Sequence, residues 1–347
     1  MNLSLASADL VAMFEHELRL CRLKEGENVL IFTDPRFPHP AYPPAAFAAA
    51  RSLGANVYLM VSQGDQTFDD KLVSAAWQSA DFILGMSVLP RGIGSWMYTE
   101  LHNEALRAGA RVLMVQEPLE VLQRMVPSEV VRQRGLLGAK RLQDAKEIHV
   151  VSKAGSDYML RKDGRQAMYQ CGIADEPGRW DHWPSGMVTC APLEDSGEGT
   201  YVIEPGDVLL GAWRHAQSRV TLTLNKGRIT AIDGGQDARL LASHLERVGD
   251  DGAFRFSHAG WGTDERANWS HVGMDSESLY GTVLVAIGRN IFDAPAPYCG
   301  MGGANVSEAH FDICCRNTSL YLDGELIIEN EQFVAADMAV PPKNLIQ

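Results

Sequence analysis

The sequence predicts an α/β protein, in which an N-terminal doubly wound parallel-sheet domain precedes a C-terminal mixed α+β domain. In the first half, short apolar runs alternate with segments of helical periodicity, which is typical of repeated βαβ units. Beyond residue 150, hairpin-like stretches with Gly, Asn and Lys at their turns replace this pattern. The 347 residues are enough for two domains, which we expect at 1–150 and 151–347.

The first 21 residues read as a helix with Ser7 or Asp9 near its N-cap, and they lack the basic start of a signal peptide. The strands predicted after it are nearly continuous in apolar residues, as in a parallel sheet covered on both faces. They are 28–34, 56–62, 81–87, 111–116 and 147–152. The helices predicted between them are 43–54, 70–80 and 96–109, and Gly54 and Gly109 mark two C-termini.

The second half contains three hairpin-like stretches and two predicted helices. The hairpin-like stretches are 200–210, 219–235 and 318–334, and the helices are 238–250 and 276–290.

Composition excludes several classes of function. The formal net charge of -13 argues against a nucleic-acid partner, which requires a basic face. No window holds the roughly 18–20 apolar residues of a membrane-spanning helix, so we expect no membrane partner and a cytoplasmic protein. The proline-rich stretch 31–44 after the first strand lacks the GxGxxG loop of a dinucleotide site. The six cysteines have no paired zinc spacing and are expected to be buried thiols.

Three residues are candidate metal ligands. His310 and Asp312 lie two apart in an apolar run, so they share one face of a predicted strand. A buried aspartate needs a partner or a metal. His258 ends another apolar run, just before a glycine turn. Two histidines and one carboxylate form the facial set of non-haem Fe(II) enzymes, although hydrolytic zinc uses the same ligand types.

The stretch 174–186 combines charged residues with tryptophans, and its prolines exclude a continuous helix. We interpret it as a substrate loop, with His182 as acid/base, Arg179 as a cation for an anionic oxygen, and Trp180 and Trp183 as aromatic walls beside Glu176. The alternative is an ion-paired surface loop. A further cation, Lys153, follows a predicted strand, and it either approaches the site or only forms a turn.

These stretches resemble one enzyme family, the 2,5-dihydroxypyridine 5,6-dioxygenases, over most of the chain. The resemblance rests on "SKAGSD" (152–157), "ADEPGRWDHWPSG" (174–186), "SHAGWG" (257–262) and "HFDICCRN" (310–317). It implies Fe(II) at His258, His310 and Asp312, with His182 beside the substrate, and a homo-oligomer. More distantly, the second domain resembles the aminopeptidase T-type metallopeptidases, which share the fold.

Differences from both families refine this expectation. The peptidases carry a glutamate where this chain has Met187, another where it has His258, and a histidine near Leu284, so the ligands of a two-metal site are missing. Three positions depart from the dioxygenase pattern and imply a possible change of substrate. They are Tyr98, Gln170 and Ala286, of which Tyr98 and Gln170 are expected to bind the substrate.

The predicted function is therefore that of an Fe(II)-dependent, extradiol-type ring-cleaving dioxygenase whose metal lies in the C-terminal domain. Its substrates would be O2 and a hydroxylated N-heteroaromatic such as 2,5-dihydroxypyridine, which gives N-formylmaleamate, or a related dihydroxylated ring. Arg179 or Lys153 would hold an anionic oxygen. The alternatives are an aminopeptidase T-like zinc metallohydrolase and a metal-free binding module.

Overall fold

The computed structural model describes residues 3–62, 71–87, 99–292 and 294–339. Contacts within the chain define two compact units, each assembled from several segments. Unit 1 comprises Met1–Pro127, Gln170–Pro184 and Ala294–Cys299, and unit 2 comprises Ser128–Tyr169, Ser185–Asp293 and Gly300–Gln347. The units thus interleave along the chain, whereas the sequence analysis expected two consecutive segments meeting near residue 150.

Unit 1 contains a five-stranded parallel sheet in the order β2-β1-β3-β4-β8. Its strands are β1 (Asn28–Thr33), β2 (Asn56–Val61), β3 (Phe82–Met86), β4 (Arg111–Val115) and β8 (Trp180–Trp183). The first four were predicted and are confirmed. The fifth was expected at 147–152, but it comes from the stretch predicted to be a substrate loop. A four-residue strand with a tryptophan at each end and two polar residues between them shows no apolar periodicity that could be recognised.

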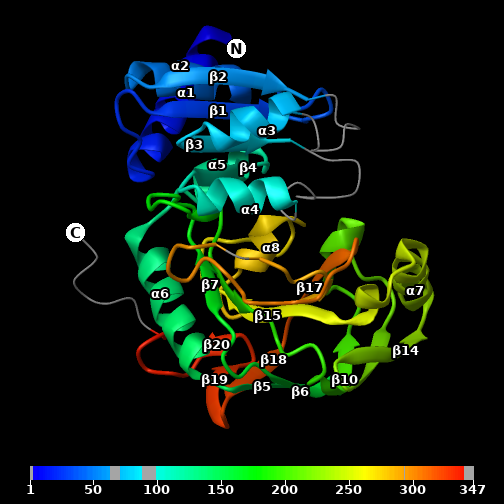
Figure 1. Ribbon diagram of the computed structural model, residues 1–347. Helices are drawn as coiled ribbons and strands as arrows, with labels where there is room; N and C mark the ends of the chain where they lie inside the picture. The colour runs from blue at the N-terminus through cyan, green and yellow to red at the C-terminus, as the bar shows by residue number, and fades with distance from the viewer. Residues whose placement is uncertain (1–2, 63–70, 88–98, 293, 340–347) are drawn as a thin grey trace. The chain divides into compact units, whose positions relative to one another are not determined.

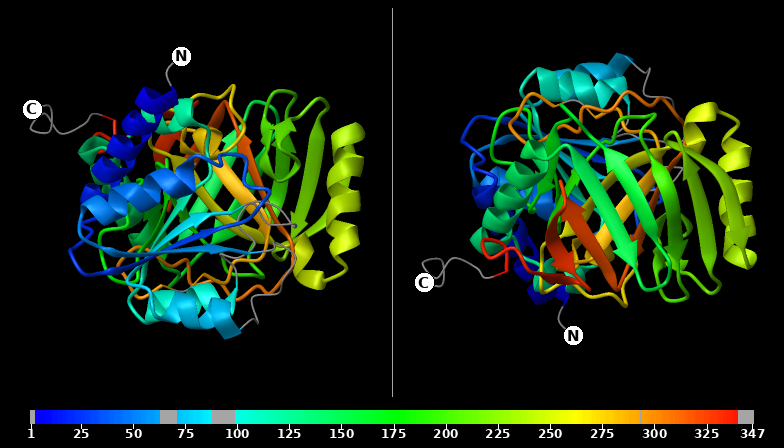
Figure 2. Two further views of the ribbon diagram at one scale, coloured as in Figure 1. Left: turned by 90° about the horizontal axis from the view of Figure 1, so that it is seen from above. Right: turned by 90° about the horizontal axis from the view of Figure 1, so that it is seen from below.

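Helices cover both faces of this sheet (Figures 1 and 2). They are α1 (Leu3–Leu20), α2 (Tyr42–Ser52), α3 (Lys71–Gln78), α4 (Glu100–Arg107) and α5 (Leu119–Arg124). On one face, Phe14 of α1 packs edge-on against Trp183 of β8, with ring centroids 5.4 Å apart. On the other, Trp77 of α3 packs against Phe32 of β1 at 5.5 Å. The predicted α1 cap is wrong, because the helix already begins at Leu3.

Unit 2 is built around two further sheets, whose orders are β14-β13-β10-β6-β5-β18-β19-β20 and β12-β11-β17-β16-β15-β9-β7. The strands of the first are β5 (Glu147–Ser152), β6 (Asp157–Arg161), β10 (Glu198–Ile203), β13 (Val220–Asn225), β14 (Arg228–Gly234), β18 (Thr318–Leu322), β19 (Glu325–Glu329) and β20 (Gln332–Phe333). Those of the second are β7 (Ala167–Gln170), β9 (Met187–Cys190), β11 (Val208–Leu209), β12 (Arg214–His215), β15 (Phe256–Gly262), β16 (Val283–Gly288) and β17 (His310–Cys315). The helices are α6 (Glu129–Asp144), α7 (Gln236–Val248) and α8 (Met274–Ser278).

Aromatic side chains join the two sheets of unit 2. Tyr158 of β6 and Tyr201 of β10 both pack edge-on against Phe256 of β15, at 5.7 and 5.9 Å. Helix α6 lies close to the second sheet because Gly138 has no side chain, and a Cβ there would lie 2.9 Å from Val188. Strand β15, which carries one of the candidate metal ligands, therefore packs against both the first sheet and α6.

Three predictions for residues of unit 2 need correction. Strand 147–152 pairs antiparallel with β6 and β18, because its alternation of Ile148 and Val150 with polar residues suits a sheet buried on one face. Residues 200–210 form no hairpin, since β10 and β11 belong to different sheets. The apolar run 283–288, predicted as part of a helix, is the buried central strand β16, because length and apolarity alone do not separate the two structures.

Candidate functional site

The candidate metal ligands belong to two strands of unit 2, β15 and β17, which lie on either side of β16. In the register of these strands, Ala286 of β16 lies opposite His258 of β15 on one side and Asp312 of β17 on the other. Directly paired residues point to the same face of an antiparallel sheet. Because Ala286 offers only a methyl group, the two longer side chains meet across it. His310 pairs with Gly288 in the same way, two residues along β17.

The donor atoms of His258, His310 and Asp312 all lie within 4.8 Å of one another. Asp312 Oδ1 is 3.2 Å from the Nε2 atoms of both histidines. Ligand atoms at right angles around an ion, with bonds of about 2.1 Å, are about 3 Å apart. The two separations that involve Asp312 are therefore close to those between ligands of one metal ion, and two histidines with one carboxylate are a known metal-binding set.

Hydrogen bonding orients one of the imidazoles. His310 Nδ1 lies 3.0 Å from the carbonyl oxygen of Arg289, an acceptor, so this nitrogen donates and Nε2 is directed to Asp312. Such a bond to the far nitrogen is the usual second contact of a metal-binding histidine. His258 is buried, with 5% of its surface exposed.

The electrostatics of the group follow from burial and from its own charges. Burial alone would raise the pKa of Asp312, but His310 and His258 lower it well below its usual range. Burial lowers the pKa of His258 against the opposing effect of Asp312. For His310, the carboxylate and the Arg289 carbonyl outweigh burial and raise the pKa. A carboxylate ionised between two imidazoles is the charge state that binds a cation.

A network of hydrogen bonds fixes the glycine-rich segment that leads into β17. Asn305 donates to the carbonyl oxygen of Gly288 at 2.7 Å. Asp250 accepts from the Ser307 hydroxyl at 2.8 Å and from the Glu308 N–H at 2.9 Å. Gly303 lies so close to Asn290 that a Cβ would collide with its side chain. This close approach explains why a glycine occupies position 303.

In unit 1, strand β8 presents His182 next to Trp180 and Gln170. His182 Nδ1 lies 3.1 Å from Gln170 Oε1, and the rings of His182 and Trp180 are 4.8 Å apart. Side chains alternate along a strand, so Trp180 and His182 face one side and Asp181 and Trp183 the other. The structure thus brings together three of the residues that the sequence analysis selected.

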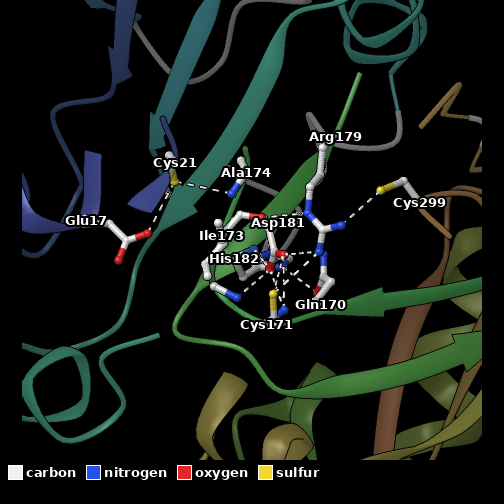
Figure 3. A network of polar contacts seen from close by, with 11 residues as sticks. Glu17, Cys21, Gln170, Cys171, Ile173, Ala174, Arg179, Asp181, His182 and Cys299 are labelled. Carbon is white, nitrogen blue, oxygen red and sulfur yellow. Dashed lines mark hydrogen bonds and ion pairs between the residues drawn. The ribbon is translucent and has the colours of Figure 1, made fainter. Parts of the chain in front are cut away.

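Arg179 and Asp181 form a buried ion pair beneath this strand, as Figure 3 shows. The guanidinium, 1% exposed, donates to Asp181 at 3.0 Å and to the Ile173 carbonyl at 2.6 Å. Asp181 also accepts from the N–H groups of Cys171, Gly172 and His182. Burial raises the pKa of Asp181, although Arg179 and these N–H groups oppose the shift. The role predicted for Arg179 needs correction, because its charge is neutralised inside the unit.

The two tryptophans cannot line one pocket together. Trp183 packs on Phe14 of α1, while Trp180 faces His102 of α4, with centroids 5.7 Å apart. Strand alternation explains this separation, because residues 180 and 183 point to opposite faces. Only Trp180 stays a candidate wall beside His182. Glu176 is half-buried in the turn before β8, where its carbonyl oxygen accepts from the Arg179 N–H.

The remaining predicted residues lie elsewhere or outside the described part of the chain. Lys153 is exposed in the turn after β5 and lines a cavity of about 980 Å³ with Asp207, Trp269 and Arg316. Its neighbour Ser152 pairs with Thr318, which follows the C-terminal end of β17, whereas His310 begins that strand. Lys153 is therefore separated from the metal-ligand group by the length of that strand. Tyr98 lies outside the described residues.

Sequence reasoning missed two residues with clear structural roles. Asp181 was noted only as one of several charges, yet it binds two segments of chain together. The available signal was the "WDHW" stretch itself, because an acidic residue flanked by tryptophans is expected to be buried and therefore paired. Ala286 was noted as a departure from a family pattern. Its position between two candidate ligands becomes visible only from the pairing of β16 with β15 and β17.

Comparison with known proteins identifies the family that the chain resembles. A sequence model of the family 2,5-dihydroxypyridine 5,6-dioxygenase matches residues 9–335. The chain is 33% identical to the 2,5-dihydroxypyridine 5,6-dioxygenase of Pseudomonas putida KT2440, over 98% of both proteins. The solved structure of 2,5-dihydroxypyridine dioxygenase from that strain has a TM-score of 0.84 at 32% identity, covering 96% of this chain and 99% of the other.

A second solved structure, wild-type AmpT from Thermus thermophilus, has a TM-score of 0.63 at 13% identity, covering 94% of this chain and 99% of the other. This likeness shows a shared fold only, and the aminopeptidase-like alternative is not favoured. Within the described residues, no helix combines the length and apolarity needed to cross a membrane. The α/β fold class is confirmed, and the chain belongs to the 2,5-dihydroxypyridine 5,6-dioxygenase family of ring-cleaving enzymes.

Proposed function

We propose that this enzyme is an Fe(II)-dependent, extradiol-type dioxygenase that opens 2,5-dihydroxypyridine, or a closely related dihydroxylated ring, with O2. With 2,5-dihydroxypyridine the product would be N-formylmaleamate. The observation that carries the proposal is the group of His258, His310 and Asp312, whose donor atoms lie within 4.8 Å in a chain of this family.

His258, His310 and Asp312 would hold the iron. Two neutral imidazoles and one carboxylate suit Fe(II), and they leave coordination positions for other molecules. When bound, the iron would allow electron density to pass from the electron-rich ring to O2. The 3.2 Å separations between Asp312 and both histidines support this assignment. Their positions on hydrogen-bonded strands support it too, because rigid elements keep ligands in place.

His182 would exchange a proton with a substrate hydroxyl, and Trp180 would lie against the ring. The proposal is supported by their common side of β8 and by the 4.8 Å between their rings. Arg179 would act inside unit 1 as the partner of Asp181 rather than on the substrate. Lys153 would act on an anionic group only if the substrate extended to its turn, and its exposure makes it a suitable surface control.

The test is turnover after anaerobic loading. The protein is mixed with Fe(II) and 2,5-dihydroxypyridine without air, and O2 uptake and ring absorbance are followed after air is admitted. We expect iron-dependent loss of ring absorbance only after O2 enters, in wild type and Lys153→Ala. His258→Gln should take up no O2 above background. Absence of turnover with every dihydroxylated pyridine and benzene tested would contradict the proposal.

We also propose that the enzyme is a homo-oligomer of the cytoplasm. Strand β2, at the edge of the parallel sheet, supports self-association, because it carries no charge and leaves Tyr58 and Val61 59% and 58% exposed. Edge strands of monomers are usually protected by charge or proline. Light scattering of the purified protein tests this, and Val61→Lys should shift the mass toward the monomer.

A further inference from the structure

We propose that Gln170 is a positioning residue, which holds the imidazole of His182 in the tautomer with its proton on Nδ1. The inference rests on the proposed function, in which His182 exchanges a proton with the substrate. It replaces the prediction that Gln170 binds the substrate.

The argument begins with the hydrogen-bonding capacity of the two groups. Gln170 Oε1 lies 3.1 Å from His182 Nδ1, and the residues are 0% and 4% exposed. A carbonyl oxygen only accepts, so Nδ1 must donate. A neutral imidazole carries one N–H, and the lone pair is then on Nε2. Gln170 therefore selects the tautomer in which Nε2 is the nitrogen that accepts a proton.

The backbone on both sides of this contact is anchored by one carboxylate. Asp181 accepts from the N–H groups of Cys171 and Gly172, which follow Gln170, and from the N–H of His182 itself (Figure 3). The attachment points of both side chains are thus fixed to the same buried group. The Trp180 ring, 4.8 Å away, packs against His182 and further restricts its orientation.

The neutrality of the amide has a consequence for the charge of His182. A carboxylate at position 170 would place a negative charge about 3 Å from the ring and favour imidazolium, with a shift of about 1–3 pH units. Among the described residues, the charged or titratable groups around β8 include His102 of α4, which faces Trp180, and the ion pair of Arg179 and Asp181. The thiols of Cys171 and Cys299 contact this pair. Met114 pairs with His182 on the neighbouring strand and is uncharged. The amide of Gln170 adds no such charge beside the ring.

Two variants and a matched control test the inference. Gln170→Leu removes the acceptor at similar size, and Gln170→Glu adds the charge. Gln143→Leu removes a glutamine of α6 whose Oε1 accepts from the Ala167 N–H, at the opposite end of β7 from Gln170. The first readout is the ¹⁵N spectrum of histidine-labelled, metal-free protein, with His182 assigned by its loss in His182→Asn. The second is the pH profile of kcat/KM with iron and substrate.

We expect wild type and Gln143→Leu to show Nδ1–H at His182. Gln170→Leu should show mixed tautomers and lose about tenfold in kcat at nearly unchanged KM, the effect of one neutral hydrogen bond. Gln170→Glu should raise the His182 titration and the acid limb of kcat/KM by about 1–2 pH units. An Nε2–H tautomer in wild type, or a Gln170→Leu spectrum identical to wild type, would overturn the inference. Because the spectrum needs no turnover, failure of the proposed function would leave this result readable.

Discussion

The ion pair of Arg179 and Asp181 gives the sharpest prediction for stability. Arg179→Met removes a charge from a pair whose side chains are 1% and 0% exposed, and it leaves the Asp181 carboxylate buried without its cation. Loss of one partner from such a pair costs about 3–5 kcal/mol of unfolding free energy. Three backbone donors remain on Asp181, so we expect the lower part of this range.

The assay is urea unfolding followed by tryptophan fluorescence, with Arg19→Met as the matched control. Arg19 pairs with Glu15 at side-chain exposures of 62% and 32%, so its loss should leave the urea midpoint nearly unchanged. Adding Asp181→Asn to Arg179→Met should recover part of the loss, because a buried amide leaves no charge uncompensated. If Arg179→Met keeps wild-type stability but loses kcat/KM, our structural account is wrong and Arg179 acts on the substrate.

Three further predictions concern the metal-ligand group and its support. Ala286→Leu should weaken iron binding about tenfold or more, because the larger side chain fills the space between His258 and Asp312. Ala259→Leu changes a residue on the opposite face of the sheet and should leave iron binding unchanged. The iron content of each variant after dialysis measures both effects. Removal of iron with a chelator should abolish O2 uptake but leave the far-ultraviolet circular dichroism spectrum unchanged, because the ligands lie on hydrogen-bonded strands. Loss of the spectrum would mean that the metal is needed for folding. Burial acts to raise the pKa of Asp250, but its hydrogen bonds outweigh burial and lower the pKa. The ionised carboxylate therefore stabilises the folded protein above the unfolded pKa of about 3.9, and this stabilisation is lost as the pH falls through the folded pKa. Asp250→Asn should therefore lower the urea midpoint at pH 7 and differ less from wild type as the pH falls below about 4; an equal difference at both pH values would exclude this linkage.

The sequence was most informative where periodicity and burial agreed. Strands β1, β3 and β4 are continuous apolar runs buried on both faces, so pattern alone predicted them. The hairpin of β13 and β14 was equally clear, because Lys226 and Gly227 occupy the positive-φ positions of its tight turn. Prediction from the sequence failed at β16, whose six buried residues suit a helix as well as a strand. Only the pairing with β15 and β17 decides between them.

The candidate metal ligands were selected correctly as a spatial group, although their role stays a prediction. His310 and Asp312 were recognisable together because they lie two apart on one strand. His258 is about fifty residues earlier in the chain, and only the order of β15, β16 and β17 explains why it meets them. Around His182, sequence composition selected the right stretch but predicted a loop, whereas residues 180–183 form the strand β8. In a strand, successive side chains point to opposite faces, and in a loop they do not.

That alternation explains how four residues of β8 combine structural and chemical roles. Asp181 and Trp183 point to one face, where Asp181 pairs with Arg179 and Trp183 packs on Phe14 of α1. Trp180 and His182 point to the other face, beside Gln170. Because the backbone between the two faces is shared, the buried ion pair that stabilises the strand also fixes the direction of the imidazole. A loop of the same sequence would have to hold His182 by contacts of its own, and it would lose the precision that a strand of a packed sheet provides.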